Sequence, residues 1–264
     1  MVGGVLLDVD GVLTVSWVAL PDAAATIGRL RDTNMAFRLV TNTSSKSRRQ
    51  ISRLLGDAGM PVDDGHIVTA VTSAARLLNG RYPGRQCLVV NEGDLGDDLE
   101  QVDTVGLDGA AGAGVVLLGG AGPAVGYAEL NTVFRLASDG VPVVALHRNT
   151  RFQTADGPAL DMGAFIIALE AAADIEVTVV GKPAPEFYAA ALAELGVDAA
   201  DAVMVGDDIV SDVVGAQDCG ITGVLVRTGK FRDADLHRGH GRPDHIIDSI
   251  GDLPDLLDRL LPET

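Results

Sequence analysis

The sequence predicts an α/β protein: a doubly wound, mostly parallel sheet with a second α/β domain inserted into it. Short apolar runs alternate with helical patterns near both ends of the chain, which is typical of right-handed strand–helix–strand units on a parallel sheet. Several of these runs end in acidic or other polar residues, and the middle of the chain repeats the alternation by itself. A chain of 264 residues that is 47% hydrophobic and 22% charged has enough apolar material for a packed core and for more than one domain.

The first predicted elements lie near the N-terminus. Residues 4–8 are a short apolar run that ends in acid, as expected of a buried parallel strand. Pro21 opens a helical pattern, because proline in the first turn of a helix loses no hydrogen bond. Residues 37–41 are predicted as a second strand, and the capping-box spacing of Ser47 and Gln50 starts a second helix. This part of the chain therefore alternates strand, helix, strand and helix.

The same alternation returns near the C-terminus. Residues 177–180 are β-branched and are predicted as a strand, and residues 186–195 as a helix that stops at Gly196. Two further strands are predicted over residues 202–205 and 223–226. These elements are expected to join the N-terminal ones in one sheet.

The predicted insert is an α/β domain over residues 78–176, and residues 1–77 plus 177–264 form the domain that it interrupts. Its expected elements are strands over 87–90, 115–118 and 141–146 and helices over 129–137 and 163–173. Residues 109–128 carry no charge, but seven glycines and a proline there favour a buried strand between turns over a membrane helix.

The charge balance excludes several classes of partner. The formal net charge is −17, whereas a nucleic-acid-binding protein normally carries a basic surface, and an anionic membrane would repel this chain. We therefore expect neither nucleic acid nor membrane as a partner. Two cysteines, Cys87 and Cys219, cannot build a disulfide framework, and the N-terminus lacks a signal-peptide pattern, so a cytoplasmic protein is expected.

Polar residues follow the predicted strands where each strand ends. These residues are Asp8 and Asp10, Thr41 and Asn42, Lys182, and the acids Asp207, Asp208 and Asp212. Because ligands bind beyond the carboxyl ends of strands in open α/β sheets, these side chains are expected at one edge. Clustered carboxylates repel one another unless a cation lies among them, and their oxygens suit Mg²⁺. The lysine, hydroxyl and amide donors suit a phosphate group.

Such a set of residues can transfer a phosphoryl group. One carboxylate attacks phosphorus and forms an aspartyl-phosphate, which water then hydrolyses. Mg²⁺ and Lys182 offset charge on the phosphoryl oxygens. A second acid two residues away, on the same strand face, can protonate the leaving oxygen and later activate water.

The residues resemble a known family. Asp8-Val-Asp10-Gly11-Val-Leu-Thr14 is similar to the DxDGx(L/V)T signature of the haloacid dehalogenase-like (HAD) hydrolase superfamily. Thr41-Asn42, Lys182 and the run 206–212 resemble its second, third and fourth motifs, in the same order. The insert lies between the second and third motifs, where type-2 (C2) caps of the superfamily lie. Neighbouring segments resemble the branch of phospholysine phosphohistidine inorganic pyrophosphate phosphatases, with NagD-like and nitrophenylphosphatase-like enzymes close by.

The resemblance implies a HAD-like Rossmannoid core with a cap, and a Mg²⁺-dependent phosphatase acting on a small phosphorylated metabolite. It implies that Asp8 is the nucleophile and a metal ligand. Asp10 would be the general acid/base and would offer the metal its backbone carbonyl. Thr41 and Asn42 would hold the phosphoryl group, and Lys182 would neutralise it.

The same resemblance assigns the acids of the last motif. Asp207 would bind the metal directly, Asp212 would be a second ligand or orient Lys182, and Asp208 would lie just outside the metal ligands. Some phospholysine-type relatives lack the second acid of the first motif, so Asp10 favours phosphate esters over their P–N substrates. The resemblance also implies a homodimer formed through the cap.

Other functions remain open at this point. A receiver-like signalling module, phosphorylated on aspartate, shares the sheet-edge acids, but Asp10 and the long insert argue against it. Within enzymes, the alternative is a phospholysine or pyrophosphate phosphatase. His147, Arg148 and Arg151 in the insert are candidates to face the substrate.

Overall fold

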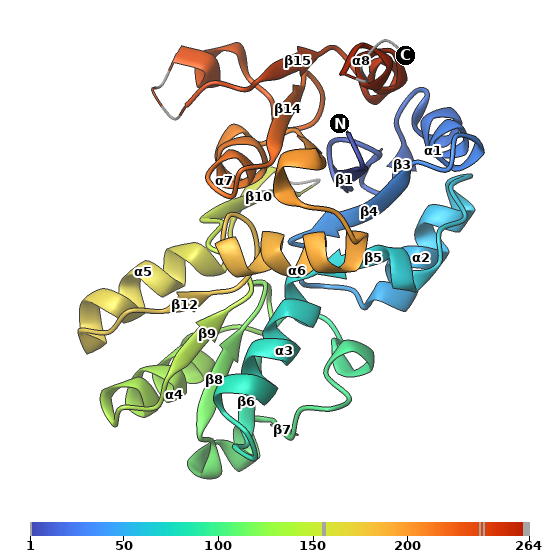
Figure 1. Ribbon diagram of the computed structural model, residues 1–264. Helices are drawn as coiled ribbons and strands as arrows, with labels where there is room; N and C mark the ends of the chain where they lie inside the picture. Colours follow the sequence, from blue (N-terminus) through green and yellow to red (C-terminus); the bar gives the residue numbers. More distant parts are fainter. Residues whose placement is uncertain (1, 155–156, 238, 240, 261–264) are drawn as a thin grey trace. The chain divides into compact units, whose positions relative to one another are not determined.

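A computed structural model describes residues 2–154, 157–237, 239 and 241–260 (Figure 1). Its contacts divide the chain into two compact units. Unit 1 comprises residues 1–41, 48–68 and 182–264, and unit 2 comprises residues 42–47 and 69–181. Unit 2 therefore includes a short loop, residues 42–47, that is far from the rest of it in the sequence. The two units are described separately below.

Unit 1 is built on a six-stranded sheet. Its strands lie in the order β15 (His245–Ile247), β14 (Thr222–Val226), β13 (Ala202–Gly206), β1 (Gly4–Asp8), β4 (Ala36–Thr41) and β5 (Ile67–Thr69). The pairs from β15 to β4 are parallel. The strands that follow β1 in the chain extend to one side of it and the later ones to the other, so the sheet is doubly wound.

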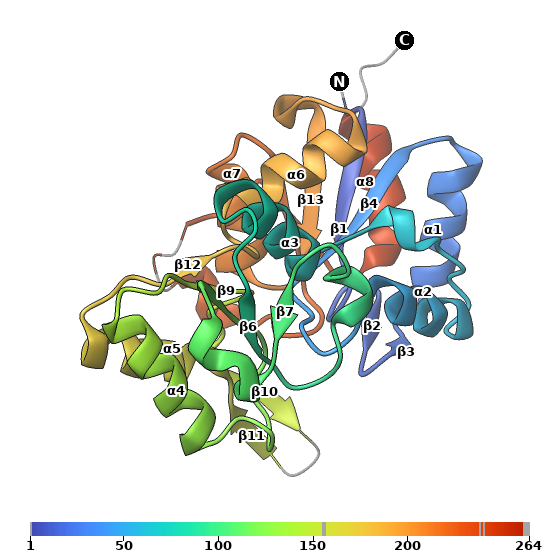
Figure 2. The ribbon, with the colours of Figure 1, turned by 90° about the horizontal axis from the view of Figure 1, so that it is seen from below.

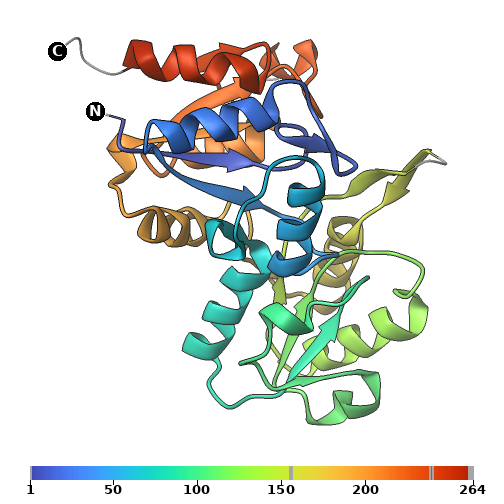
Figure 3. The same cartoon turned by 90° about the vertical axis from the view of Figure 1, so that its right-hand side faces the viewer.

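Helices cover both faces of this sheet. The alternation of side chains along β1 sends Val5 and Leu7 into one hydrophobic core and Leu6 into another. The first core is closed by α1 (Ala23–Asp32), α2 (Arg48–Asp57) and α8 (Leu253–Leu260). The second is closed by α6 (Pro185–Leu195) and α7 (Gly215–Gln217). Figure 3 shows the blue α1 and red α8 on one face and the ochre α6 on the other.

Unit 2 is built on a five-stranded sheet of its own. Its order is β12 (Thr178–Val179), β9 (Val143–Ala145), β8 (Val115–Leu118), β6 (Cys87–Val90) and β7 (Thr104–Val105), and every pair is parallel. The first strand, β6, has β7 on one side and the later strands on the other, so this sheet is doubly wound as well.

The helices of unit 2 also cover both faces of their sheet. Residues of α4 (Tyr127–Ser138) and α5 (Met162–Ala173) pack with Leu88 and Val116, whereas α3 (Ala70–Arg81) packs with Cys87 and Leu117. In Figure 2 the green α4 and yellow-green α5 lie beside each other. A hairpin of β10 (Arg151–Thr154) and β11 (Gly157–Leu160) precedes α5.

The remaining elements are short. Unit 1 has a hairpin of β2 (Thr14–Val15) and β3 (Val18–Ala19) and a π-helical turn, η5 (Ile209–Val214). The 3-10 helices are η1 (Asp64–His66), η2 (Gly96–Asp98), η3 (Leu107–Gly112), η4 (Ala199–Asp201), η6 (Asp233–His237) and η7 (Ile250–Asp252). None of the helices in the described ranges is long and apolar enough to cross a membrane.

The predicted α/β class is confirmed, and most predicted elements are present. The uncharged stretch 109–128 holds the buried strand β8, as predicted. Residues 177–180 were expected in the interrupted domain, but Thr178 and Val179 pair with β9 in the sheet of unit 2. The contact boundaries fall at residues 69 and 181 rather than at 78 and 176. The two short hairpins were not predicted, because two-residue to four-residue strands leave little periodicity to detect.

Candidate active site

The acids of the first and fourth motifs meet at the centre of the unit 1 sheet. Asp8 is the last residue of β1, and Asp207 directly follows β13, the strand paired with β1. This is where the winding of the sheet reverses, so the carboxyl ends of β1 and β13 leave a crevice for a ligand. Both carboxylates are buried.

Lys182 connects two of the acids. Its Nζ lies 2.7 Å from Asp8 Oδ1 and 2.7 Å from Asp212 Oδ1, and 3.4 Å from the carbonyl oxygen of Val40 near the end of β4. The lysine and both acids are buried. A buried ammonium between two carboxylates is a charge-assisted contact that fixes all three side chains.

The turn after β13 sets the position of Asp212. Asp208 accepts hydrogen bonds from the N–H groups of Val210 and Ser211 and so begins the π-helical turn η5. Asp212 Oδ2 accepts a hydrogen bond from the N–H of Asp208 (3.1 Å). Gly206 is required here, because a Cβ on it would lie 2.1 Å from the Cβ of Asp212.

Backbone atoms surround one carboxylate oxygen of Asp207, Oδ2. Its Oδ2 accepts a hydrogen bond from the N–H of Lys230 (2.6 Å). Cβ atoms at Gly11 (φ 90°) and Gly229 (φ 59°) would lie 1.9 and 2.0 Å from that oxygen, so both positions need glycine for space and for conformation. Thr228 joins the two loops by donating a hydrogen bond to the carbonyl oxygen of Gly11 (2.5 Å).

Burial and mutual repulsion shift the pKa values of two acids in this cluster. Burial, followed by the charges of Asp8 and Asp212, raises the pKa of Asp207 to about 8. Burial raises the pKa of Asp212 to about 6 despite the opposing charge of Lys182. Burial alone lowers the pKa of Lys182, but Asp212 and Asp8 outweigh it and raise that pKa. Three buried acids share one buried lysine, so the cluster has an excess of negative charge.

The donor set fits a hard divalent cation. Asp8, Asp207 and Asp212 each offer a carboxylate oxygen within 4.8 Å of the others, the one such group in the described part of the chain. Asp207 Oδ1 is buried and has no hydrogen-bond donor among the described residues. Several carboxylate oxygens around one point, one of them lacking a donor, are typical of a Mg²⁺ site.

The remaining predicted site residues, Asp10, Thr41 and Asn42, lie outside the carboxylate cluster. The side chain of Asp10 is exposed and is not in the carboxylate cluster, while the backbone around it turns through a hydrogen bond from Gly11 N–H to Thr14 O. Thr41 ends β4 and is buried. Asn42 belongs to unit 2.

Four residues near the cluster were not predicted from the sequence. Thr228, Gly229 and Lys230 follow β14. The hydroxyl of Tyr188 donates to the carbonyl oxygen of Ser211 (2.5 Å) and lies 3.2 Å from the carbonyl oxygen of Asp212. Partial removal from water lowers the pKa of Lys230, but the charges of Asp207, Asp8 and Asp212 raise it overall. The sequence signal was the Thr-Gly-Lys run that begins two residues after the predicted strand 223–226.

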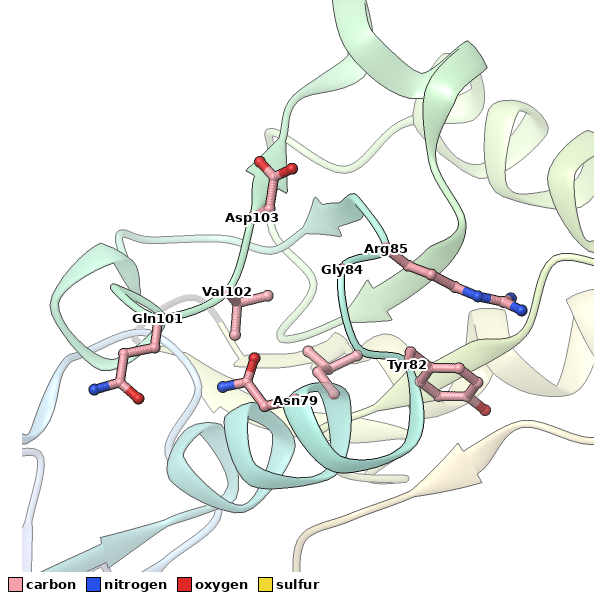
Figure 4. A pocket seen from close by; sticks show the side chains of 8 residues that line it. Asn79, Tyr82, Gly84, Arg85, Gln101, Val102 and Asp103 are labelled. Carbon is pink, nitrogen blue, oxygen red and sulfur yellow. The ribbon is translucent and has the colours of Figure 1, made fainter.

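Two hollows in unit 2 lack such chemistry. One lies where α3 ends and is lined by residues that include Asn79, Tyr82, Arg85 and Asp103 (Figure 4). The other is an apolar groove between α4 and α5. Neither contains a group of metal-ligating acids within the described residues.

The fold agrees with what comparison with known proteins shows. A family model described as haloacid dehalogenase-like hydrolase matches residues 5–105, and one described as HAD-hydrolase-like matches residues 179–253. The phospholysine phosphohistidine inorganic pyrophosphate phosphatase of Bos taurus is 37% identical over 97% of this chain and 94% of its own length. The human haloacid dehalogenase-like hydrolase domain-containing protein 2 is 36% identical over 97% of this chain and 95% of its own length.

Solved structures agree with the sequence relatives. The p-nitrophenyl phosphatase from Archaeoglobus fulgidus has a TM-score of 0.89 and 27% identity, covering 96% of this chain and 98% of its own. A glycerol phosphate phosphatase from Mycobacterium tuberculosis, solved in complex with magnesium, has a TM-score of 0.83 and 25% identity, covering 94% of this chain and 76% of its own. NagD from E. coli, at 24% identity and a TM-score of 0.84, shares the fold.

These findings define the class of protein: a hydrolase with an α/β fold, whose acids gather where the winding of a doubly wound sheet reverses. The chain belongs to the haloacid dehalogenase-like hydrolases, and it is a phosphatase of that family. The predicted family and enzyme class are therefore confirmed.

Proposed function

We propose that this phosphatase hydrolyses a small phosphorylated metabolite, with Mg²⁺, through an aspartyl-phosphate on Asp8. The observation that carries the proposal is the buried contact of Lys182 with both Asp8 and Asp212, beside Asp207 and its unsatisfied oxygen. A lysine fixed against one oxygen of a carboxylate leaves the other oxygen available for attack on phosphorus. The receiver-like alternative gains no support from relatives, whose names include phosphatases and hydrolases.

In the first half of the reaction, a carboxylate oxygen of Asp8 bonds to phosphorus and the bond to the leaving oxygen breaks. Asp10 gives its proton to that oxygen, as a general acid. Lys182 offsets charge on the phosphoryl oxygens, and Thr41 and Asn42 hold them by hydrogen bonds. The products are the free alcohol and the phosphorylated Asp8.

In the second half, water attacks the phosphorus. Asp10, now ionised, accepts a proton from that water, the bond between phosphorus and Asp8 breaks, and inorganic phosphate leaves. Asp8 and Asp207, with the backbone carbonyl of Asp10, would hold the Mg²⁺. Asp212 orients Lys182, and Asp208 supports Asp212 through its N–H. When bound, Mg²⁺ supplies positive charge that draws the phosphate to this edge and stabilises the transition state.

The remaining parts of the proposal concern the rest of the chain. The interrupted domain is the catalytic core, and the insert is a C2-type cap that selects the leaving group. We propose a cytoplasmic enzyme, and a homodimer joined through the cap. Light scattering coupled to size-exclusion chromatography tests the dimer, and a monomeric mass at micromolar protein would remove it from the proposal.

One experiment tests the reaction itself. Phosphate release is measured from a panel of phosphorylated metabolites and p-nitrophenyl phosphate, with Mg²⁺ and with EDTA. Turnover that requires Mg²⁺ and is concentrated on one ester supports the proposal. No release from any compound, with phosphate accumulating on the protein, would refute it and favour the receiver-like module.

A second candidate substrate class comes from the names of two relatives. Phospholysine phosphohistidine inorganic pyrophosphate phosphatases of rat and cattle are 34% and 37% identical to this chain. Phospholysine and pyrophosphate therefore belong in the same panel. A kcat/KM for either of them above that of every ester would replace the ester as the proposed substrate.

A further inference from the structure

The carboxyl edge of the unit 2 sheet is crossed by residues 42–47, which reach it from elsewhere in the sequence. The crossing begins at β12 and β9. Gly181 follows β12 closely, and a Cβ on it would lie 2.4 Å from Asn42 Oδ1 and 2.3 Å from the carbonyl oxygen of Leu146. The side chain of Asn42 therefore lies directly against the backbone at the end of β12.

The next residues of the segment lie at the ends of the next strands. Ser44 Oγ is 3.3 Å from Nε2 of His147, which follows β9. The same oxygen would be 2.6 Å from a Cβ on Gly120, after β8, and the carbonyl oxygen of Ser45 would be 2.7 Å from a Cβ on Gly93, after β6. The segment thus passes the ends of β12, β9, β8 and β6 in their order across the sheet.

The segment occupies the place where a doubly wound sheet binds a ligand. The winding of this sheet reverses between β6 and β8, and ligands of such sheets bind beyond the carboxyl ends of the strands at that point. Here Ser44 and Ser45 fill that place, and Ser47 fixes the far end by a hydrogen bond to Asp97 Oδ2 (3.2 Å). Residues 42–47 therefore occupy the position in unit 2 that a bound ligand takes in other doubly wound sheets.

His147 is itself held in one orientation. It is 3% exposed, and its Nδ1 lies 4.0 Å from Asp161 Oδ2. Asp161 is fixed by the N–H groups of Ala121 and Met162, both of which donate to Oδ1. The ring nitrogen within hydrogen-bond distance of Ser44 Oγ is Nε2, and the tautomer of the ring sets which of the two atoms donates. The serine is itself buried and locked into the segment, which fits a holding contact rather than a nucleophile.

We propose that Ser44 and His147 are positioning residues for the phosphatase reaction. They hold the segment 42–47 on the edge of unit 2 and thereby fix Asn42, two residues before Ser44, for binding the phosphoryl group. This inference rests on the proposed function, which assigns Asn42 to the phosphate. It makes phosphate affinity depend on a contact made wholly within unit 2.

The first test removes the contact from either side. Ser44→Ala and His147→Leu are each expected to raise KM for p-nitrophenyl phosphate about threefold to tenfold, with kcat changed less than about twofold. The dissociation constant of inorganic phosphate, measured by calorimetry with Mg²⁺, should rise by the same factor. His147→Gln, whose amide reaches the position of Nε2, should restore most of the affinity. The double variant should be no worse than the worse single variant, because both remove one interaction.

A second test displaces the segment by volume. Gly120→Ala places a methyl group 2.6 Å from Ser44 Oγ, whereas the next nearest atom, Ser44 Cβ, is at 3.8 Å. Gly120→Ala alone should therefore weaken phosphate binding at least as much as Ser44→Ala. Adding Ser44→Ala to Gly120→Ala removes the clashing atom, so the double variant should bind phosphate better than Gly120→Ala alone.

Controls separate positioning from loss of stability. Thr26→Val removes a buried hydroxyl that bonds the carbonyl oxygen of Ile250 in unit 1, and it should lower the melting temperature without changing KM. Hydrogen exchange of the amides of residues 43–47 should be faster by about tenfold in Ser44→Ala and His147→Leu and unchanged in Thr26→Val.

The outcomes distinguish this inference from the proposed function. Unchanged exchange, or faster exchange with unchanged phosphate affinity, would overturn the positioning role while the phosphatase reaction stands. A wild-type protein that neither releases nor binds phosphate would overturn the proposed function, and the role of Asn42 with it. Loss of kcat without a change in KM would also contradict a positioning role.

Discussion

The two sheets of this protein are both doubly wound, but different residues occupy their carboxyl edges. We call the edge of the unit 1 sheet the open edge and that of the unit 2 sheet the closed edge. In unit 1 the edge carries Asp8, Asp207 and Asp212 around one lysine, and Asp207 keeps an oxygen with no donor in the described residues. In unit 2 the corresponding edge is filled by the chain's own residues 42–47, with hydrogen bonds to side chains of unit 2. The topology creates the same crevice twice, and the residues at the strand ends decide whether it stays open to a ligand.

The two edges differ in whether their buried polar groups have partners. Burying acids with too few partners raises their pKa values and costs stability, which a protein tolerates where a cation or substrate will supply the missing charge. A hydrogen-bonded loop that fills the crevice leaves no such cost, and the edge then fixes the loop in place. The first edge can therefore do chemistry, and the second can hold a binding residue in place.

The largest effect is expected from the nucleophile of the open edge. Asp8→Asn should lower turnover of p-nitrophenyl phosphate by about 10³-fold or more, because the amide cannot form the aspartyl-phosphate. Circular dichroism should remain that of the wild type. Asp57→Asn, at an exposed position on α2, is the matched control and should keep full activity. Near-normal activity in Asp8→Asn would refute the mechanism.

Lys182→Met should be the next most damaging change. Removing the ammonium leaves Asp8 and Asp212 buried and uncompensated, which costs about 3–5 kcal/mol in stability, and turnover should fall by about 100-fold. Denaturant unfolding and phosphate release measure the two effects. Arg227→Met, which removes an exposed pair with Asp248, should change stability by less than about 1 kcal/mol. If both variants lost the same stability and turnover, the special role of the buried Lys182 cluster would be refuted.

Removing the metal should reveal the excess charge of the open edge. The pKa of Asp207 is raised from 3.8 to about 8, so in EDTA the folded protein binds more protons than the unfolded one between these pH values. Stability in EDTA should therefore fall as pH rises from about 5 to 8.

Saturating Mg²⁺ should raise the melting temperature by about 5 °C at pH 8 and by less at pH 5. Asp207→Asn should lose most of both the pH dependence and the Mg²⁺ response. Identical melting curves for the wild type with Mg²⁺ and with EDTA would show that the cluster does not bind the cation.

The smallest effect is expected from a charge near the closed edge. Arg148, a sequence-based candidate to face the substrate, forms a two-pronged contact with Glu170, and hydrogen bonding to Arg148 lowers the pKa of Glu170. Its contribution is present above the unfolded pKa of Glu170 and is lost as pH falls through the folded value. Arg148→Gln should lower stability at pH 7 by less than about 1 kcal/mol and change kcat/KM less than about threefold. A tenfold loss of kcat/KM would contradict this prediction and indicate that Arg148 contacts the substrate.

Local patterns in the sequence were enough to predict most of the strands and helices. The buried runs that became β1, β6 and β8 were predicted within one residue of their bounds, because an apolar run that ends at a polar residue or glycine is a local signal. The positions of Asp8 and Asp207 at the ends of two predicted strands also predicted correctly that these two residues meet, since parallel strands bring their carboxyl ends to one edge. Lys182 was correctly expected beside them, although the strand before it belongs to the other sheet.

Partner choice across the chain could not be predicted in the same way. The strand at 178–179 was assigned to the wrong sheet, because its β-branched pattern is the same whether it pairs with β9 or with a strand of unit 1. The backbone N–H of Lys230 on Asp207 left no pattern at all, since any residue offers that donor.

The sequence by itself therefore determined the α/β class, the acids at the strand ends and the family, because periodicity and motif spacing are properties of neighbouring residues. Only the tertiary structure decided that Lys182 pairs with both Asp8 and Asp212, and that residues 42–47 close the edge of unit 2. These contacts depend on strand order and on which glycines leave space for a side chain, and both arise only when distant segments pack together.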